Sequence, residues 1–151
     1  MAQQGFDFSR LTMGQKGLLI TGAVFLIDLF LPWESVGLLG FTAGNISGFN
    51  GIGVLAGILV ILLLVWEVMA MAGVNLNLNV SDALISAGLA AGTVLFGLIR
   101  FLIAVTRQGT DPSFGAWVGV IVLLAMAYAA WLRFNESKTA PAPPPAPPPA
   151  A

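Results

Sequence analysis

The sequence predicts an all-α integral membrane protein: a four-helix bundle followed by a disordered Pro/Ala-rich tail. Of the 151 residues, 58% are hydrophobic and 9% charged, whereas a soluble domain has about 25% charged residues to cover its surface. Apolar runs long enough to cross a bilayer recur four times. After Arg133 the composition changes, and this last segment holds seven of the nine prolines.

The missing residue types and the charge balance restrict the function. The chain contains no Cys and no His, so it lacks thiolate nucleophiles, imidazole bases and the usual zinc and haem ligands. We therefore expect no enzymatic activity, no catalytic residues, no cofactor and no metal. The net charge of −1 argues against a nucleic-acid-binding surface, which needs clustered Lys and Arg.

Residues 1–135 form the expected transmembrane domain. Its spans are expected at about residues 16–31, 51–72, 83–106 and 112–132. Before the first span, Thr12 and Gln15 match the T-x-x-Q form of a capping box, which marks a helix start. Pro32 ends that span. No A-x-A-like cleavage site follows, so we expect this helix to be retained rather than removed as a signal peptide.

Charged and turn residues mark the other three spans. The second carries Glu67 near its end, and the third contains Arg100. Asp111 and Pro112 supply an N-cap and a proline in the first helical position for the fourth span. This last span is free of charge as far as Leu132.

Flanking charges predict the orientation. Four basic residues flank the termini, namely Arg10, Lys16, Arg133 and Lys138. The loops between spans contain one, Arg107. The positive-inside rule then places both termini in the cytoplasm and the chain in the plasma membrane. We also expect Trp33 and Trp117 to anchor the outer interface, and Trp66 and Trp131 the inner one.

Two segments outside the spans have a distinct composition. Residues 32–50 form the longest loop, which is Gly-rich, faces outside and either lies on the membrane surface or folds over the bundle. Residues 136–151 form the tail, which is expected to sample polyproline II. The tail is either simply solvated or a ligand for a cytoplasmic partner that binds proline-rich segments.

Three ionisable residues lie within the spans and are candidate site residues, because charge at that depth costs roughly 2.5–3.5 kcal/mol on insertion scales. Asp28 and Arg100 differ in depth by about 5 Å at 1.5 Å per helical residue, so we expect an intramembrane ion pair between them. Glu67 lies near the inner face, where we expect it to pair with Lys16 or to extend into the cytoplasmic interface.

Small residues spaced four apart recur on the later spans and allow helices to approach closely. The pairs are Gly53 and Gly57, Gly88 and Gly92, Gly115 and Gly119, and Ala125 and Ala129. They favour either a tight bundle or a homo-oligomer.

The element LFLPWESV (29–36), followed by a Gly/Ser-rich loop and GIGVLAG (51–57), resembles small four-span membrane proteins of actinobacteria. These proteins carry an LPW element at the same place and often a Pro/Ala-rich cytoplasmic tail. The resemblance covers residues 17 to about 135. It implies no assigned activity, so no functional residues are transferred from it.

The sequence thus predicts a structural or accessory multi-pass membrane protein that contacts the lipid bilayer and assembles with itself or with other membrane proteins. The alternative is a small transporter or channel component that uses Asp28 and Arg100 within the bilayer. Under the first hypothesis, the same two residues only hold helices together.

Overall fold

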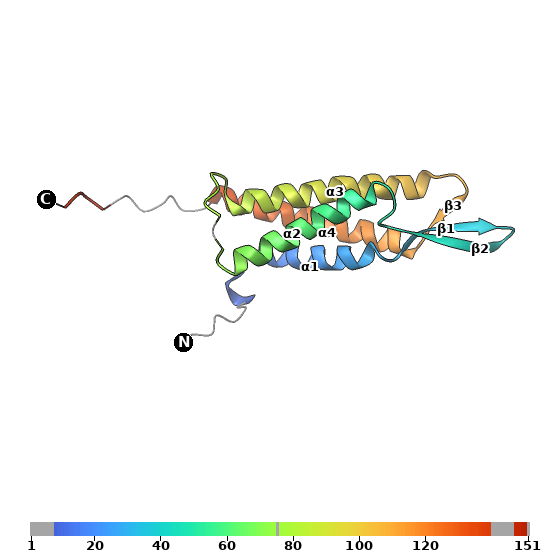
Figure 1. Cartoon of the computed structure of the whole chain (residues 1–151), viewed down its shortest axis with the longest axis horizontal. Helices are drawn as coiled ribbons and strands as arrows, with labels where there is room; N and C mark the ends of the chain where they lie inside the picture. The colour runs from blue at the N-terminus through green and yellow to red at the C-terminus, as the bar shows by residue number, and fades with distance from the viewer. Residues whose placement is uncertain (1–7, 75, 140–146, 151) are drawn as a thin grey trace.

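The computed structural model describes residues 8–74, 76–139 and 147–150. Four helices run side by side as a bundle, and a small sheet closes one end of it (Figure 1). The elements are η1 (Phe8–Arg10), α1 (Met13–Asp28), β1 (Pro32–Leu38), β2 (Phe41–Ser47), α2 (Gly53–Met71), α3 (Asp82–Thr106), β3 (Thr110–Pro112) and α4 (Phe114–Thr139). The fold is therefore mostly helical, as expected, with a sheet that was not predicted.

Three of the helices, α2, α3 and α4, are long and apolar enough to cross a membrane, by length and composition. α1 is shorter, with 16 residues, which correspond to about 24 Å against a hydrocarbon core of about 30 Å. The capping box that starts α1 is confirmed, since Thr12 and Gln15 bond to each other reciprocally. α1 ends at Asp28 rather than at residue 31. Phe30 and Leu31 form turn hydrogen bonds to the residues three before them, and the helical conformation is disfavoured for a residue that precedes a proline, here Pro32.

α4 continues beyond the predicted end of the fourth span. We expected this span to end at Leu132, but the helix runs to Thr139. The predicted span ends where the apolar run meets its first charged residue, Arg133. The helix continues because no helix-breaking Gly or Pro occurs before Pro141. The predicted tail therefore begins after residue 139 rather than at 136. Its residues 140–146 and 151 lie outside the described part, and 147–150 have no regular secondary structure.

The predicted outer loop is largely a β-hairpin. β1 lies at the centre of an antiparallel sheet of order β2-β1-β3. Leu39 and Gly40 form its tight turn, both with positive φ (51° and 83°), which is the geometry of two-residue hairpin turns. The hairpin extends beyond the helices along the long axis of the bundle, away from the end where α1 begins and α4 ends (Figure 1).

The inside of the bundle is closely packed, and its outside is apolar. Phe25, Leu63, Leu123 and Met126 are fully buried. Large apolar side chains are exposed around the outside of all four helices, among them Ile20, Ile27, Ile58, Leu62, Leu95, Leu102, Ile121 and Leu124. A helix bundle with this exterior is suited to lipid rather than to water.

Two of the predicted small-residue motifs allow close approaches inside the chain. A Cβ at Gly53 would collide with the backbone of Gly48, and a Cβ at Gly57 with the ring of Phe49. A Cβ at Gly115 would lie 2.6 Å from the carbonyl oxygen of Pro32, and a Cβ at Gly119 would collide with Trp33. These two glycines therefore let α4 contact the start of β1 directly. A Cβ at Gly88, in contrast, would meet no atom within 4 Å.

Candidate functional site

The sheet end of the bundle holds a buried ion pair that joins a strand to a helix. Arg100 on α3 donates from Nη1 to the carboxylate of Glu34 on β1, and both side chains are almost fully buried. Arg100 Nη2 also donates to the backbone oxygen of Ser47, at 3.2 Å. Arg107, about half exposed, approaches the other oxygen of Glu34 at 3.5 Å. One carboxylate is thus shared between two guanidinium groups.

Glu34 reaches this position because the start of β1 is irregular. Trp33 and Glu34 are consecutive, yet both are fully buried, whereas a regular strand places neighbours on opposite faces. The pairing of β1 with β2 shifts register between Pro32 and Glu34, and such a bulge redirects side chains locally. Both residues therefore face the bundle.

The surroundings of Glu34 keep it ionised. Burial acts to raise the pKa of Glu34. The hydrogen bond and the charge of Arg100, together with Thr110 and Arg107, outweigh this effect and hold the pKa below its ordinary value. The carboxylate is therefore charged at neutral pH and balances Arg100.

The predicted ion pair between Asp28 and Arg100 is wrong. Asp28 Oδ2 instead accepts a hydrogen bond from Trp33 Nε1 at 3.1 Å, and its Oδ1 has no hydrogen-bond partner in the described part of the chain. Arg100 lies over the same indole, with Cζ 5.8 Å from the ring centroid. The two residues do lie near the same end of the bundle, as their depth predicts, but Trp33 stands between them. We call Asp28, Trp33, Glu34, Arg100 and Arg107 the sheet-end cluster.

The opposite end of the bundle holds a second cluster. Glu136 on α4 accepts hydrogen bonds from Thr12 Oγ1 at 2.8 Å, from the Gly14 backbone at 3.1 Å and from Arg133 Nη1 at 3.2 Å. Arg133 Nε lies 3.9 Å from Glu67 on α2. We call Thr12, Gly14, Glu67, Arg133 and Glu136 the terminal-end cluster; it ties the start of α1 to the end of α4.

The prediction for Glu67 is therefore wrong in two respects. Its partner is Arg133 rather than Lys16, and its side chain is fully buried rather than extended into an interface. Arg133 was not expected inside the bundle, because the predicted fourth span ends at Leu132. Since α4 continues, Arg133 faces the inside of the bundle and is 7% exposed.

The four tryptophans differ in exposure. Trp117 and Trp131 are 52% and 57% exposed, near opposite ends of α4, as interfacial residues would be. Trp33 is fully buried in the sheet-end cluster, so its prediction as an interfacial anchor is wrong. Trp66 is partly buried, and its predicted place at the inner interface stays a prediction.

The hairpin tip is the most exposed apolar feature at the sheet end. Leu38, Leu39 and Phe41 are 65%, 93% and 79% exposed around the turn. The hairpin was not predicted from the sequence, because its turn is Leu-Gly rather than the Asn-Gly or Asp-Gly that marks hairpins. Its base is fixed by the burial of Trp33 and Glu34.

The helical hydroxyl groups and the acidic side chains of the two clusters are engaged within the bundle. Helical hydroxyl groups, such as those of Thr21 and Thr93, donate to backbone carbonyls of their own helix rather than to a base. Within residues 8–74, 76–139 and 147–150, no group of three acidic side chains could hold a metal ion. The charged side chains of the two clusters pair with one another, and these pairs connect the elements at each end of the bundle.

We also compared the chain with known proteins. No protein-family model matches it, and comparison with curated proteins and with solved structures gives no significant match. The resemblance to four-span proteins of actinobacteria therefore stays a prediction.

Proposed function

We propose that this protein is a non-enzymatic, multi-pass protein of the plasma membrane that presents the β1–β2 hairpin to a partner outside the membrane. The partner is a second copy of the chain or another membrane protein. The observation that carries the proposal is the exposed apolar hairpin tip on a base that the sheet-end cluster fixes to the helices.

Four crossings and a cytoplasmic location of both termini are part of this proposal. α2, α3 and α4 have the length and composition to cross, and α1 packs beside them in the same bundle (Figure 1). A short helix such as α1 is accommodated by local thinning of the bilayer. Lys16 and Lys138 lie at the end opposite the sheet, where positive charge favours the cytoplasm.

The hairpin then lies where lipid does not cover it. Each strand has seven residues, which correspond to about 24 Å at roughly 3.4 Å per residue, and the hairpin points along the bundle axis away from the helices. Three large apolar side chains at its tip therefore face water in an isolated protein. A patch of this kind marks a protein-binding surface.

A photo-crosslinking amino acid at Leu39 tests the proposal in native membranes. We expect a discrete crosslinked product from Leu39 but not from Val74, a similarly apolar, half-exposed residue in the loop at the opposite end. The mass of the product distinguishes a second copy from another protein. Leu38→Ser with Phe41→Ser should abolish the product. Equal crosslinking from both positions, or a product unaffected by these substitutions, would contradict the proposed presentation.

A further inference from the structure

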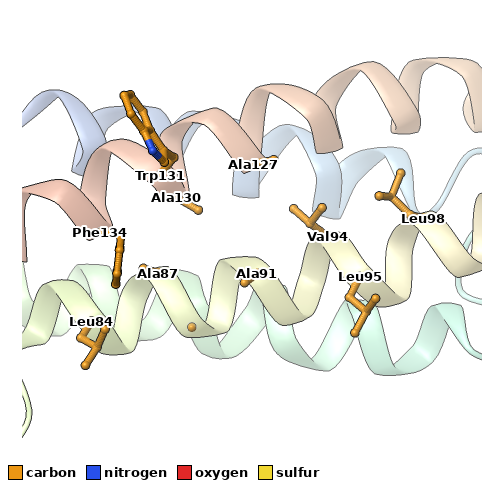
Figure 2. A pocket seen from close by; sticks show the side chains of 11 residues that line it. Leu84, Ala87, Ala91, Val94, Leu95, Leu98, Ala127, Ala130, Trp131 and Phe134 are labelled. Atoms are coloured by element: carbon orange, nitrogen blue, oxygen red, sulfur yellow. The ribbon is translucent and has the colours of Figure 1, made fainter.

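A groove of about 680 Å³ opens between α3 and α4 on the outside of the bundle (Figure 2). On α3 its floor consists of Ala87, Gly88 and Ala91, whose short side chains leave the space. On α4, Trp131 and Phe134 bound the groove toward the end where α4 finishes. Its lining contains no charged side chain.

The groove has the dimensions of a site for one slender apolar molecule. Along α3 it extends from Leu84 to Leu98, about 21 Å at 1.5 Å per residue. This exceeds the depth of one leaflet, half of a hydrocarbon core of about 30 Å. Its volume falls in the usual range of about 300–1,000 Å³ for small-molecule sites.

A cation lies at one end of this groove. Lys138 follows Phe134 by four residues on α4, so it continues the same helical face. Its Nζ lies 4.3 Å from the centroid of the Phe134 ring. Among the described residues no carboxylate lies within ion-pair distance of Lys138, because Glu136 is directed toward α1 and Arg133. The ammonium group is thus available to an anion at the end of the apolar groove.

We propose that the groove binds one acyl chain of an anionic glycerophospholipid, whose headgroup phosphate contacts Lys138. The inference rests on the membrane insertion proposed above, which places Lys138 at the inner surface. There, one basic residue and an apolar groove together select an anionic lipid: the groove provides the chain with contacts, and Lys138 provides the preference for negative charge.

Tryptophan fluorescence tests the proposal on the full chain in phosphatidylcholine vesicles that contain a low fraction of phosphatidylglycerol with brominated chains. Trp131 lines the groove, and Trp117 is a matched control on the same helix with similar exposure. Trp131→Phe and Trp117→Phe isolate the contribution of each residue. We expect the quenching of Trp131 to exceed what the fraction of brominated lipid alone would give. The quenching of Trp117 should be proportional to that fraction.

Two further variants identify the site. A Cβ at Gly88 would meet no atom within 4 Å, so Gly88→Leu should place its side chain in the groove and remove the excess quenching. Lys138→Gln should lower the preference for phosphatidylglycerol over brominated phosphatidylcholine about fivefold, whereas Lys16→Gln, at the same end of the bundle, should leave it unchanged. Equal quenching of Trp131 and Trp117 would overturn the lipid site.

The remaining outcomes are also decisive. Quenching of neither Trp117 nor Trp131 would overturn membrane insertion together with the lipid site. If Gly88→Leu changes the oligomeric state and leaves quenching unaltered, the groove binds a second copy of the chain, and the lipid proposal is wrong.

Discussion

The two ionic clusters at the ends of the bundle have opposite compositions. At the sheet end, one carboxylate, Glu34, lies between two guanidinium groups, those of Arg100 and Arg107. At the terminal end, one guanidinium group, that of Arg133, lies between two carboxylates, those of Glu67 and Glu136.

The hydrogen bonding of the two clusters differs as well. Glu34 accepts from both arginines, whereas Glu67 lies 3.9 Å from Arg133 Nε and accepts no hydrogen bond from that guanidinium group. A buried charge contributes to stability only when its partners are close and its lone pairs are satisfied. We therefore expect the sheet-end cluster to be the stronger connection.

The largest effect is expected for Arg100→Gln. This change leaves the buried Glu34 with only the half-exposed Arg107, 3.5 Å away, as a charged partner. Loss of the buried partner of such a pair typically costs about 3–5 kcal/mol of the free energy of unfolding. Denaturant unfolding of the purified protein in micelles measures it. Glu34→Gln combined with Arg100→Gln should recover much of the loss, because no unpaired charge is then buried. A loss below about 1 kcal/mol for Arg100→Gln would contradict the proposed role of the pair.

A smaller effect is expected for neutralising Glu67. Its nearest cation, Arg133 Nε, is 3.9 Å away, so Glu67→Gln should change the free energy of unfolding by no more than about 1 kcal/mol, in either direction. Glu34→Gln should cost more, since it removes a carboxylate that accepts from two arginines. Unfolding curves of the two variants under the same conditions make the comparison, and a larger loss for Glu67→Gln would reverse the ranking of the clusters.

The helices and the sheet differ in how well the sequence predicts them. Hydropathy and the Thr12 capping box locate the helices, because both are local signals. The hairpin has weak local signals, and the burial of its base depends on contacts of β1 with α3 and α4, which are distant in sequence. Arg100 was found because charge is rare in apolar segments, but its partner was missed, because Glu34 lies outside the predicted spans. Arg133 was missed as a core residue because hydropathy falls before helix propensity does.

The sheet-end cluster should also make stability depend on pH. The pKa of Glu34 is lower in the folded state than in the unfolded state, so ionised Glu34 contributes stability above its unfolded pKa. This contribution should disappear as the pH falls through the lower, folded-state pKa. Unfolding of the wild-type chain and of Glu34→Gln should therefore be compared from pH 7 downward. We expect the difference between them to shrink in acid, and a constant difference would argue against an ionised Glu34.

The smallest effect is expected for Arg107, the outer member of the sheet-end cluster. It is about half exposed and lies 3.5 Å from Glu34, so its charge is screened by solvent. Arg107→Gln should lower the free energy of unfolding by less than about 1 kcal/mol, and added salt should reduce even that difference. Since Glu34 keeps Arg100, no buried charge is left unpaired by this change. A loss as large as that of Arg100→Gln would mean that the two arginines act as one unit, and that the strength of this end of the bundle lies in a network rather than in one buried pair.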